Sequence, residues 1–168
     1  MFEAGIRRDA PKPQQYRDAI ASLESMLEGE TDALANLTNA SGLLAEALDG
    51  INWVGFYLLR GGAGGELVLG PFQGKPACVR IALGQGVCGT AADRRETLVV
   101  PDVHAFPGHI ACDAASRSEI VVPIVKDGAL RGVLDVDAPT PARFDEDDRV
   151  GLEGFVRALL PRVDWDRL

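Results

Sequence analysis

The apolar residues of this chain follow a helical period at both ends and form strand-length runs in the middle. This change of period restricts the fold more than any other feature. Residues 12–27 and 31–48 predict two helices, and residues 145–160 predict a third. The strand-like runs between them cover residues 51–59, 66–69, 78–83, 97–101, 120–125 and 129–136.

Residues at the expected boundaries support these elements. Thr31 or Asp32 is suited to cap the second helix, and Gly50 is suited to end it. Asp127-Gly128 is a strong hairpin signal between the last two strands. The apolar face predicted for the second helix contains Leu34, Leu37, Leu44 and Leu48, and that of the last helix contains Val150, Phe155, Val156, Leu159 and Leu160.

Helices at both ends and an antiparallel meander between them predict the α+β class. The 168 residues suffice for one domain with a sizeable core, so we expect a single domain over residues 1–168. Its central antiparallel sheet should be flanked by the N- and C-terminal helices. Residues 1–11 contain no interpretable motif, and we expect them to form a poorly ordered N-terminal arm.

The charge balance excludes several classes of partner. The chain has 17 basic and 25 acidic side chains and a formal charge of −8, which disfavours binding to nucleic acid. It has no apolar run long enough to span a membrane and no apolar stretch of signal-peptide type near its start. We therefore expect a cytoplasmic protein, in which the three cysteines are not a disulfide scaffold.

Residues Gly84 to Gly89 match the GxGxxG pattern of dinucleotide-binding loops. A strand-like run precedes the pattern and a short helical stretch follows it, so this interpretation stays open. However, Arg80 interrupts the preceding strand, and residues 90–96 are too few for a helix that crosses over a parallel sheet. A structural or substrate-facing glycine loop fits better.

A metal site would need Cys78, Cys88, His104, His109 and Cys112 to converge. Zinc ligands usually occur in pairs at short spacing, such as CxxC, and no such pair is present. We therefore predict no metal. For Cys78 and Cys88 taken singly, burial as inert thiols is the simpler alternative.

Cys112 differs from the other two cysteines in its surroundings. It lies in a stretch of small and polar residues, 108–116, between two predicted strands, and His109 is close in sequence. Loops often carry catalytic residues, and a nearby His or helix start lowers the pKa of a thiol. Since no Gly-x-Ser-x-Gly elbow competes with it, Cys112 is the best candidate nucleophile.

Acidic residues form the last candidate cluster. Asp135 and Asp137 alternate along a predicted strand, so their side chains share one face of the sheet. Two carboxylates on one face repel each other, which raises at least one pKa and keeps a proton available. Glu119 opens the preceding strand, across the hairpin. A solvated strand end is the alternative for this cluster.

Several separate stretches together resemble the GAF-domain free methionine-(R)-sulfoxide reductases. The resemblance covers about residues 31–160, and the cysteines have that family's spacing of 10 and 24 residues (78 to 88, 88 to 112). The resemblance rests on residues 52–58 (NWVGFYL), 69–75 (LGPFQGK), 78–81 (CVRI), 86–91 (GVCGTA), 102–104 (DVH), 109–120 and 132–137 (GVLDVD).

The resemblance implies a GAF fold and a cysteine-based reduction of free L-methionine-(R)-sulfoxide. Cys112 would attack the sulfoxide sulfur and become a sulfenic acid, as methionine leaves. Cys78 would resolve it as a disulfide, with Cys88 as an additional or substitute partner. Thioredoxin or another dithiol would then reduce the disulfide, and no bound cofactor is expected.

The resemblance also implies roles around the substrate. Glu119 and Asp137 would polarise or protonate the sulfoxide oxygen, and Asp135 would hold the amino group. Trp53 and Tyr57 would pack on the thioether methyl, although ordinary core packing explains them equally well. Backbone N–H groups near Gly86 and Gly89 would receive the carboxylate.

GAF domains also occur as non-catalytic sensors of small molecules such as cyclic nucleotides. The three cysteines and the acidic triad favour the reductase over this alternative. A homodimer formed through terminal helices is implied by the resemblance alone.

Overall fold

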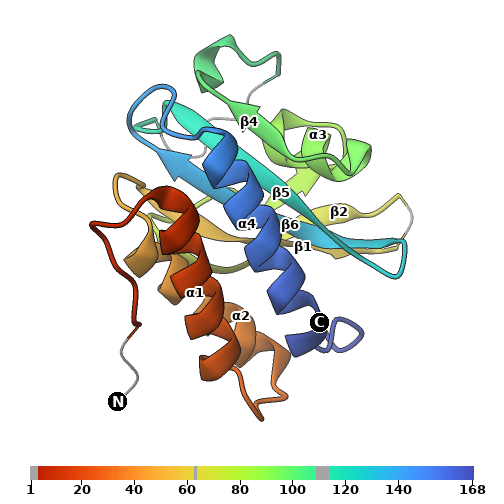
Figure 1. The fold of residues 1–168 in the computed structure, drawn as a ribbon. Coiled ribbons are helices and arrows are strands. Elements are labelled where there is room, and N and C mark those ends of the chain that lie inside the picture. The colour runs from red at the N-terminus through yellow and green to blue at the C-terminus, as the bar shows by residue number, and fades with distance from the viewer. Residues whose placement is uncertain (1–3, 63, 109–113) are drawn as a thin grey trace.

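Six strands form an antiparallel sheet in the order β3-β2-β1-β6-β5-β4 (Figure 1). The computed structural model describes residues 4–62, 64–108 and 114–168. The strands are β1 Trp53–Arg60, β2 Glu66–Gly74, β3 Arg80–Ala82, β4 Leu98–Val100, β5 Ser118–Lys126 and β6 Ala129–Ala138. The helices are α1 Lys12–Met26, α2 Ala33–Ala47, α3 Gly86–Arg94 and α4 Glu146–Leu159, with the 3-10 turns η1 Val103–Ala105 and η2 Leu160–Arg162.

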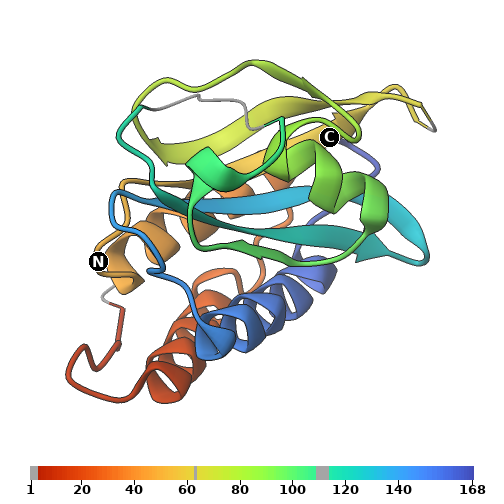
Figure 2. The same ribbon diagram turned by 90° about the horizontal axis from the view of Figure 1, so that it is seen from above.

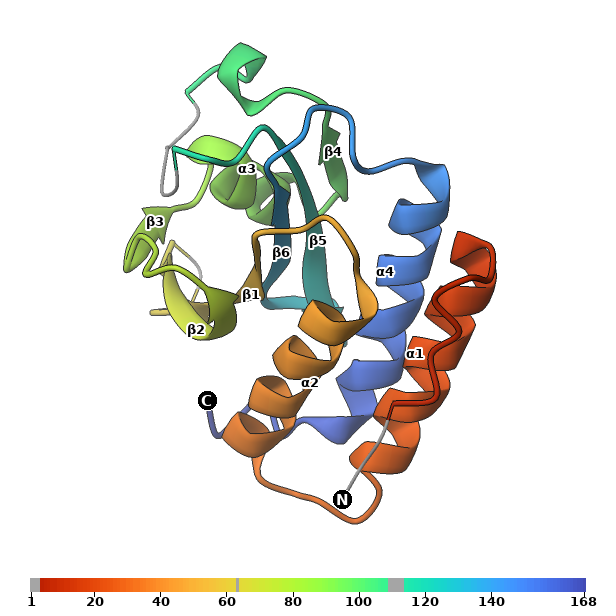
Figure 3. The same ribbon diagram turned by 90° about the vertical axis from the view of Figure 1, so that its left-hand side faces the viewer.

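The sheet separates two apolar clusters. Alternation along β1 directs Val54, Phe56 and Leu58 to the face that α1, α2 and α4 cover. Trp53 and Tyr57 point to the opposite face, where α3 packs over β5 and β6. Figures 2 and 3 show the three long helices on one side of the sheet and α3 on the other. The predicted α+β class and antiparallel sheet are confirmed, and the second face is where a site has room to form.

Most element boundaries agree with the sequence analysis. Asp32 accepts a hydrogen bond from the backbone N–H of Ala35, as expected of the cap of α2. Asp127 and Gly128 have φ angles of 52° and 76°, as a tight type I′ hairpin turn requires. The third strand is shorter than expected, because Cys78 lies in the loop before β3 rather than in the strand itself.

Two residues predicted to be buried are exposed instead. Val150 keeps 53% of its surface, because it lies two residues before buried Leu152 and hence about 200° around α4 from it. Leu34 keeps 59% of its surface in the first turn of α2, where it lines an open groove beside β2. Both predictions of burial were wrong.

The segment before α1 contacts the rest of the domain. Arg7 forms an ion pair with Asp18 at 3.0 Å, and Arg8 forms one with Asp49 at 2.8 Å. Ile6 packs against the helical core. Poor order of residues 1–11 stays a prediction. In the described part of the chain, no helix has the length and apolar character needed to cross a bilayer.

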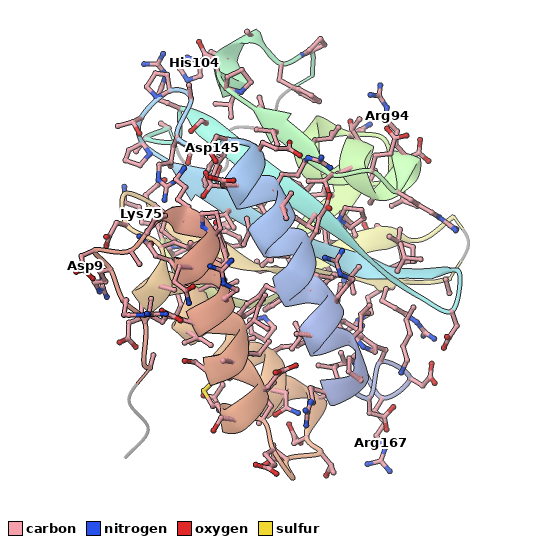
Figure 4. All side chains as sticks on the ribbon, in the orientation of Figure 1. Asp9, Lys75, Arg94, His104, Asp145 and Arg167 are labelled. Carbon is pink, nitrogen blue, oxygen red and sulfur yellow. The ribbon has the colours of Figure 1, made fainter. Side chains whose placement is uncertain are left out.

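A buried carboxylate joins α1 to α4. Asp148 is 1% exposed and accepts hydrogen bonds from Tyr16 Oη at 2.9 Å and Lys12 Nζ at 2.6 Å. Arg143 Nη1 lies 3.3 Å from the same carboxylate. Asp148 also forms a capping box with Asp145, the N-cap residue at the start of α4 (Figure 4). The side chain therefore joins two helices and the loop between β6 and α4.

We expect Asp148→Ala to lower the free energy of unfolding by about 3 kcal/mol, because it leaves the buried Tyr16 hydroxyl and the partly buried Lys12 and Arg143 cations without their partner. The control is Asp147→Ala, in the same turn but exposed, which should cost less than about 1 kcal/mol. Urea unfolding of both variants measures the difference. Equal midpoints for the two variants would contradict the assigned role.

Candidate active site

The pairing of β1, β6 and β5 places the predicted acids in one patch. Glu119 on β5 lies opposite Asp137 on β6, and Asp137 in turn lies opposite Trp53 on β1. Asp135 occupies the same face of β6 two residues away. Glu119 and Asp135 are each 6% exposed, while Asp137 is half-buried. The predicted acidic cluster is therefore a buried group and not a solvated strand end.

The glycine-rich loop brings a thiol onto this patch. Gly86 and Gly89 lie in the first turn of α3, and a Cβ at Gly89 would lie 2.3 Å from the carbonyl oxygen of Ala82. Glycine thus lets the helix sit close against the end of β3. The result is that Cys88 Sγ, 4% exposed, donates a hydrogen bond to Oε1 of Glu119 at 3.8 Å.

The same geometry bears on the dinucleotide alternative. The strands before and after α3 are β3 and β4, which occupy opposite edges of the sheet. A dinucleotide fingerprint requires a parallel crossover between neighbouring strands, and every strand pairing in this sheet is antiparallel. The GxGxxG pattern is therefore a packing motif that positions Cys88.

Aromatic side chains form the opposite wall. Trp53 and Tyr57 stack with ring centroids 5.9 Å apart, and Phe72 stacks on Trp53 at 5.3 Å. Gly55 makes this possible, because a Cβ there would lie 2.3 Å from Cβ of Phe72. Trp53 Nε1 donates to the carbonyl oxygen of Lys75, and Tyr57 Oη donates to that of Cys78 at 3.0 Å. The aromatic residues consequently hold the loop between β2 and β3 over the sheet.

These elements enclose a pocket. It is lined by the two aromatic side chains, residues 75–77, the first residues of α3 and the three acids. Two polar residues that the sequence analysis did not single out belong here: Ser116 lines the pocket, and Asn52 Nδ2 donates to Ser116 Oγ at 3.1 Å. Both residues lie inside stretches on which the family resemblance rests, and this resemblance is the sequence signal that could have identified them. Gly89 does not line the pocket, and its N–H donates to Gln85 within the helix.

The cysteines are in different states. Cys78 is disulfide-bonded, and Cys88 is a free, buried thiol. Cys112, the predicted nucleophile, and His109, three residues earlier in the sequence, lie outside the described residues. Among the described residues, the Cys88 thiol lies directly against the acids.

Burial of several acids together shifts their proton affinities. Burial, reinforced by the negative charges of Asp135 and Asp137, raises the pKa of Glu119 well above its ordinary value. Burial also raises the pKa of Asp135 to about 6, although hydrogen bonds from Cys88 and Glu119 oppose the shift. The pKa of Cys88 rises through burial and the nearby Asp135 and Glu119. The raised pKa values therefore favour a protonated Glu119 and a neutral Cys88 thiol.

The GAF domain family model matches residues 22–159 of this chain. A free methionine-R-sulfoxide reductase of Escherichia coli (strain K12) is 51% identical over 148 residues, which are 88% of each chain. One from Saccharomyces cerevisiae is 44% identical over 153 residues, covering 88% of this chain and 85% of that protein. The solved free methionine-R-sulfoxide reductase from Neisseria meningitidis, in complex with its substrate, superposes with a TM-score of 0.92 at 46% identity. That superposition covers 99% of this chain and 98% of the other.

We expect Glu119→Gln to flatten the dependence of stability on pH. A carboxyl whose folded pKa is raised binds more protons in the folded than in the unfolded state, so stability falls as pH rises above the ordinary glutamate value. The maximal slope for one such proton is about 1.4 kcal/mol per pH unit. Urea unfolding at several values from about pH 5 to pH 8 measures this slope of the unfolding free energy against pH. Glu24→Gln removes an exposed carboxyl as control, and equal slopes in the two variants would contradict the expected protonation.

Proposed function

Because this chain belongs to the GAF-domain free methionine-R-sulfoxide reductases, a family of oxidoreductases, we propose that it reduces free L-methionine-(R)-sulfoxide to L-methionine. The observation that carries the proposal is the pocket lined by buried Glu119, whose pKa is raised, and by the aromatic pair Trp53 and Tyr57. The aromatic wall suits the apolar thioether of the substrate, and the acidic wall suits its polar sulfoxide oxygen.

The acids supply the proton that the reaction consumes. Oxygen leaves a sulfoxide sulfur far more easily once it is protonated, and a carboxyl group kept neutral by burial and neighbouring charge is suited to this task. Glu119 is the proposed donor, and half-buried Asp137, directly across the β5–β6 ladder, assists it. Asp135 would accept the substrate ammonium, since its Oδ1 has no hydrogen-bond partner among the described residues.

The cysteines supply the electrons. The thiolate of Cys112 would attack the sulfoxide sulfur, methionine would leave, and the oxygen would remain on Cys112 as a sulfenic acid. Condensation with the Cys78 thiol forms a disulfide and releases water. The disulfide-bonded state of Cys78 supports its role as the resolving residue, because the described Cys88 is a free thiol. The raised pKa of Cys88 also makes it a poor nucleophile at neutral pH.

The remaining contacts of a free amino acid follow from the pocket walls. Trp53 and Tyr57 would pack on the methyl and thioether groups. The carboxylate would lie at the start of α3 near Gly86, because the N–H of Gly89 already donates within the helix. An enclosed pocket that holds both charged ends leaves no exit for a polypeptide.

The reaction also needs an external reductant. Thioredoxin or a similar dithiol is proposed to reduce the disulfide by thiol–disulfide exchange, so that no bound cofactor is required. This cycle fits the reducing environment of the cytoplasm. We propose a homodimer as the working form, and light scattering during size-exclusion chromatography tests this.

We expect turnover of free L-methionine-(R)-sulfoxide, with little turnover of the S epimer or of sulfoxide within a peptide. The physical reason is that both charged ends of the free amino acid are held inside the pocket. Methionine released in the presence of dithiothreitol is measured for each substrate. Comparable turnover of the peptide would exclude the closed pocket, and binding of the free sulfoxide without any turnover would favour a sensor.

Three variants separate the roles of nucleophile, resolving cysteine and acid. Cys112→Ser should abolish turnover, whereas Cys78→Ser should accumulate a sulfenic acid that a dimedone-type probe labels, as mass spectrometry can detect. Glu119→Gln should lower kcat by about 10²–10⁴, because the proton donor is lost. Glu24→Gln is the matched control for removal of a carboxyl. If the Cys112→Ser variant still turned over the substrate, Cys112 would not be the nucleophile.

A further inference from the structure

We propose that Cys88, Glu119 and Asp135 together form a binding site for a divalent cation that favours thiolate, with zinc as the best match. The three residues come from α3, β5 and β6, and all three are buried. One ligand atom from each lies within 4.8 Å of the other two. No reaction step proposed above uses Cys88 or requires these three groups to share an ion.

The distance between the ligand atoms of Cys88 and Glu119 suits a single small cation. Bonds of about 2.3 Å from zinc to sulfur and about 2.1 Å to oxygen span up to about 4.4 Å between the two ligand atoms. Cys88 Sγ and Glu119 Oε1 are 3.8 Å apart, so one ion reaches both with an angle of roughly 120°, near tetrahedral. The ligands come from two paired strands, β5 and β6, and from the helix α3 that packs on them.

A second observation points to a ligand at this position. Asp135 is 6% exposed and lines the pocket, yet its Oδ1 has no hydrogen-bond partner among the described residues. A buried carboxylate oxygen without a partner loses the free energy of its hydration and gains nothing in exchange. A cation or a donor in the pocket would supply the missing interaction.

The chemistry of the donors selects the ion. One thiolate and two carboxylates suit zinc, whereas an all-oxygen site would be expected for magnesium or calcium. Zinc must displace protons from these groups, and its charge then offsets the repulsion that keeps them neutral in its absence. Three protein ligands leave a fourth position toward the pocket, for water or for a competing group.

Zinc in this position would block the reductase, an effect that rests on the proposed function. The ion would occupy Asp135, the proposed partner of the substrate ammonium, and would remove the proton of Glu119 that the sulfoxide needs. We therefore expect zinc to inhibit turnover and the substrate to weaken zinc binding. Binding of the metal itself does not depend on the enzymatic activity.

Binding is tested first on protein whose Cys78 disulfide is intact, so that Cys88 is the thiol available to a metal. Isothermal titration with Zn²⁺ should give one equivalent and a heat that varies with the buffer, because protons are released. Co²⁺ should produce a thiolate-to-cobalt charge-transfer absorption. Cys88→Ser should abolish this absorption and weaken zinc binding at least about 100-fold, since one ligand is lost.

Glu119→Gln keeps the thiol, and should weaken binding while any bound cobalt still shows the thiolate absorption. His104→Ala is the control, because His104 in η1 is the histidine among the described residues, is exposed and does not line the pocket (Figure 4). It should bind zinc like the unmodified protein. Thermal unfolding without metal shows whether each variant is folded. Zinc binding that survives Cys88→Ser, or that is lost in His104→Ala, overturns the proposal.

Inhibition is measured with thioredoxin as reductant, because dithiothreitol itself binds zinc. We expect zinc to raise the apparent KM for free methionine-(R)-sulfoxide, and His104→Ala to be inhibited equally. Stoichiometric zinc binding without inhibition overturns the proposed competition with the substrate. If the protein shows no reductase activity at all, the proposed function fails, and the titrations still decide whether the metal site exists.

Discussion

The register between β1, β6 and β5 is the constraint on which the site depends. It places Trp53, Asp137 and Glu119 in one row across three neighbouring strands, with Asp135 beside them on the same face. A shift of one residue in either pairing would turn the affected side chains to the other face, against the three long helices. The tight Asp127-Gly128 turn and the alternating apolar residues both oppose such a shift.

Gathering acids on a buried face carries an electrostatic cost, and the protein accommodates it by protonation. Ionisation of Glu119 is disfavoured because it would place a second negative charge beside Asp135 in a buried site. The same arrangement makes the Cys88 thiol harder to ionise. A proton donor, a thiol that ionises poorly and a carboxylate oxygen that lacks a hydrogen-bond partner within the described part of the chain are thus three consequences of one cluster. The proposals for reduction and for zinc both follow from this cluster.

Local patterns predicted the elements well and their environment less well. The hairpin, the cap at Asp32 and the three long helices were all predictable, because each depends on neighbouring residues. Val150 and Leu34 were assigned to buried faces on spacing alone, but the direction of a helix face depends on the elements packed against it. The GxGxxG pattern likewise fits two structures, and only the antiparallel order of the strands separates them.

The sequence by itself determined the class of fold, the family resemblance and the identities of the candidate cysteines and acids, since these are properties of residue type and spacing. Only the tertiary structure decided that Cys88 lies against Glu119 and that the N–H of Gly89 donates within α3. It also decided that Oδ1 of Asp135 has no hydrogen-bond partner among the described residues. The physical reason is that these contacts join segments far apart in the chain. The distances between these groups, and therefore their protonation, depend on how α3 packs on the paired strands β5 and β6.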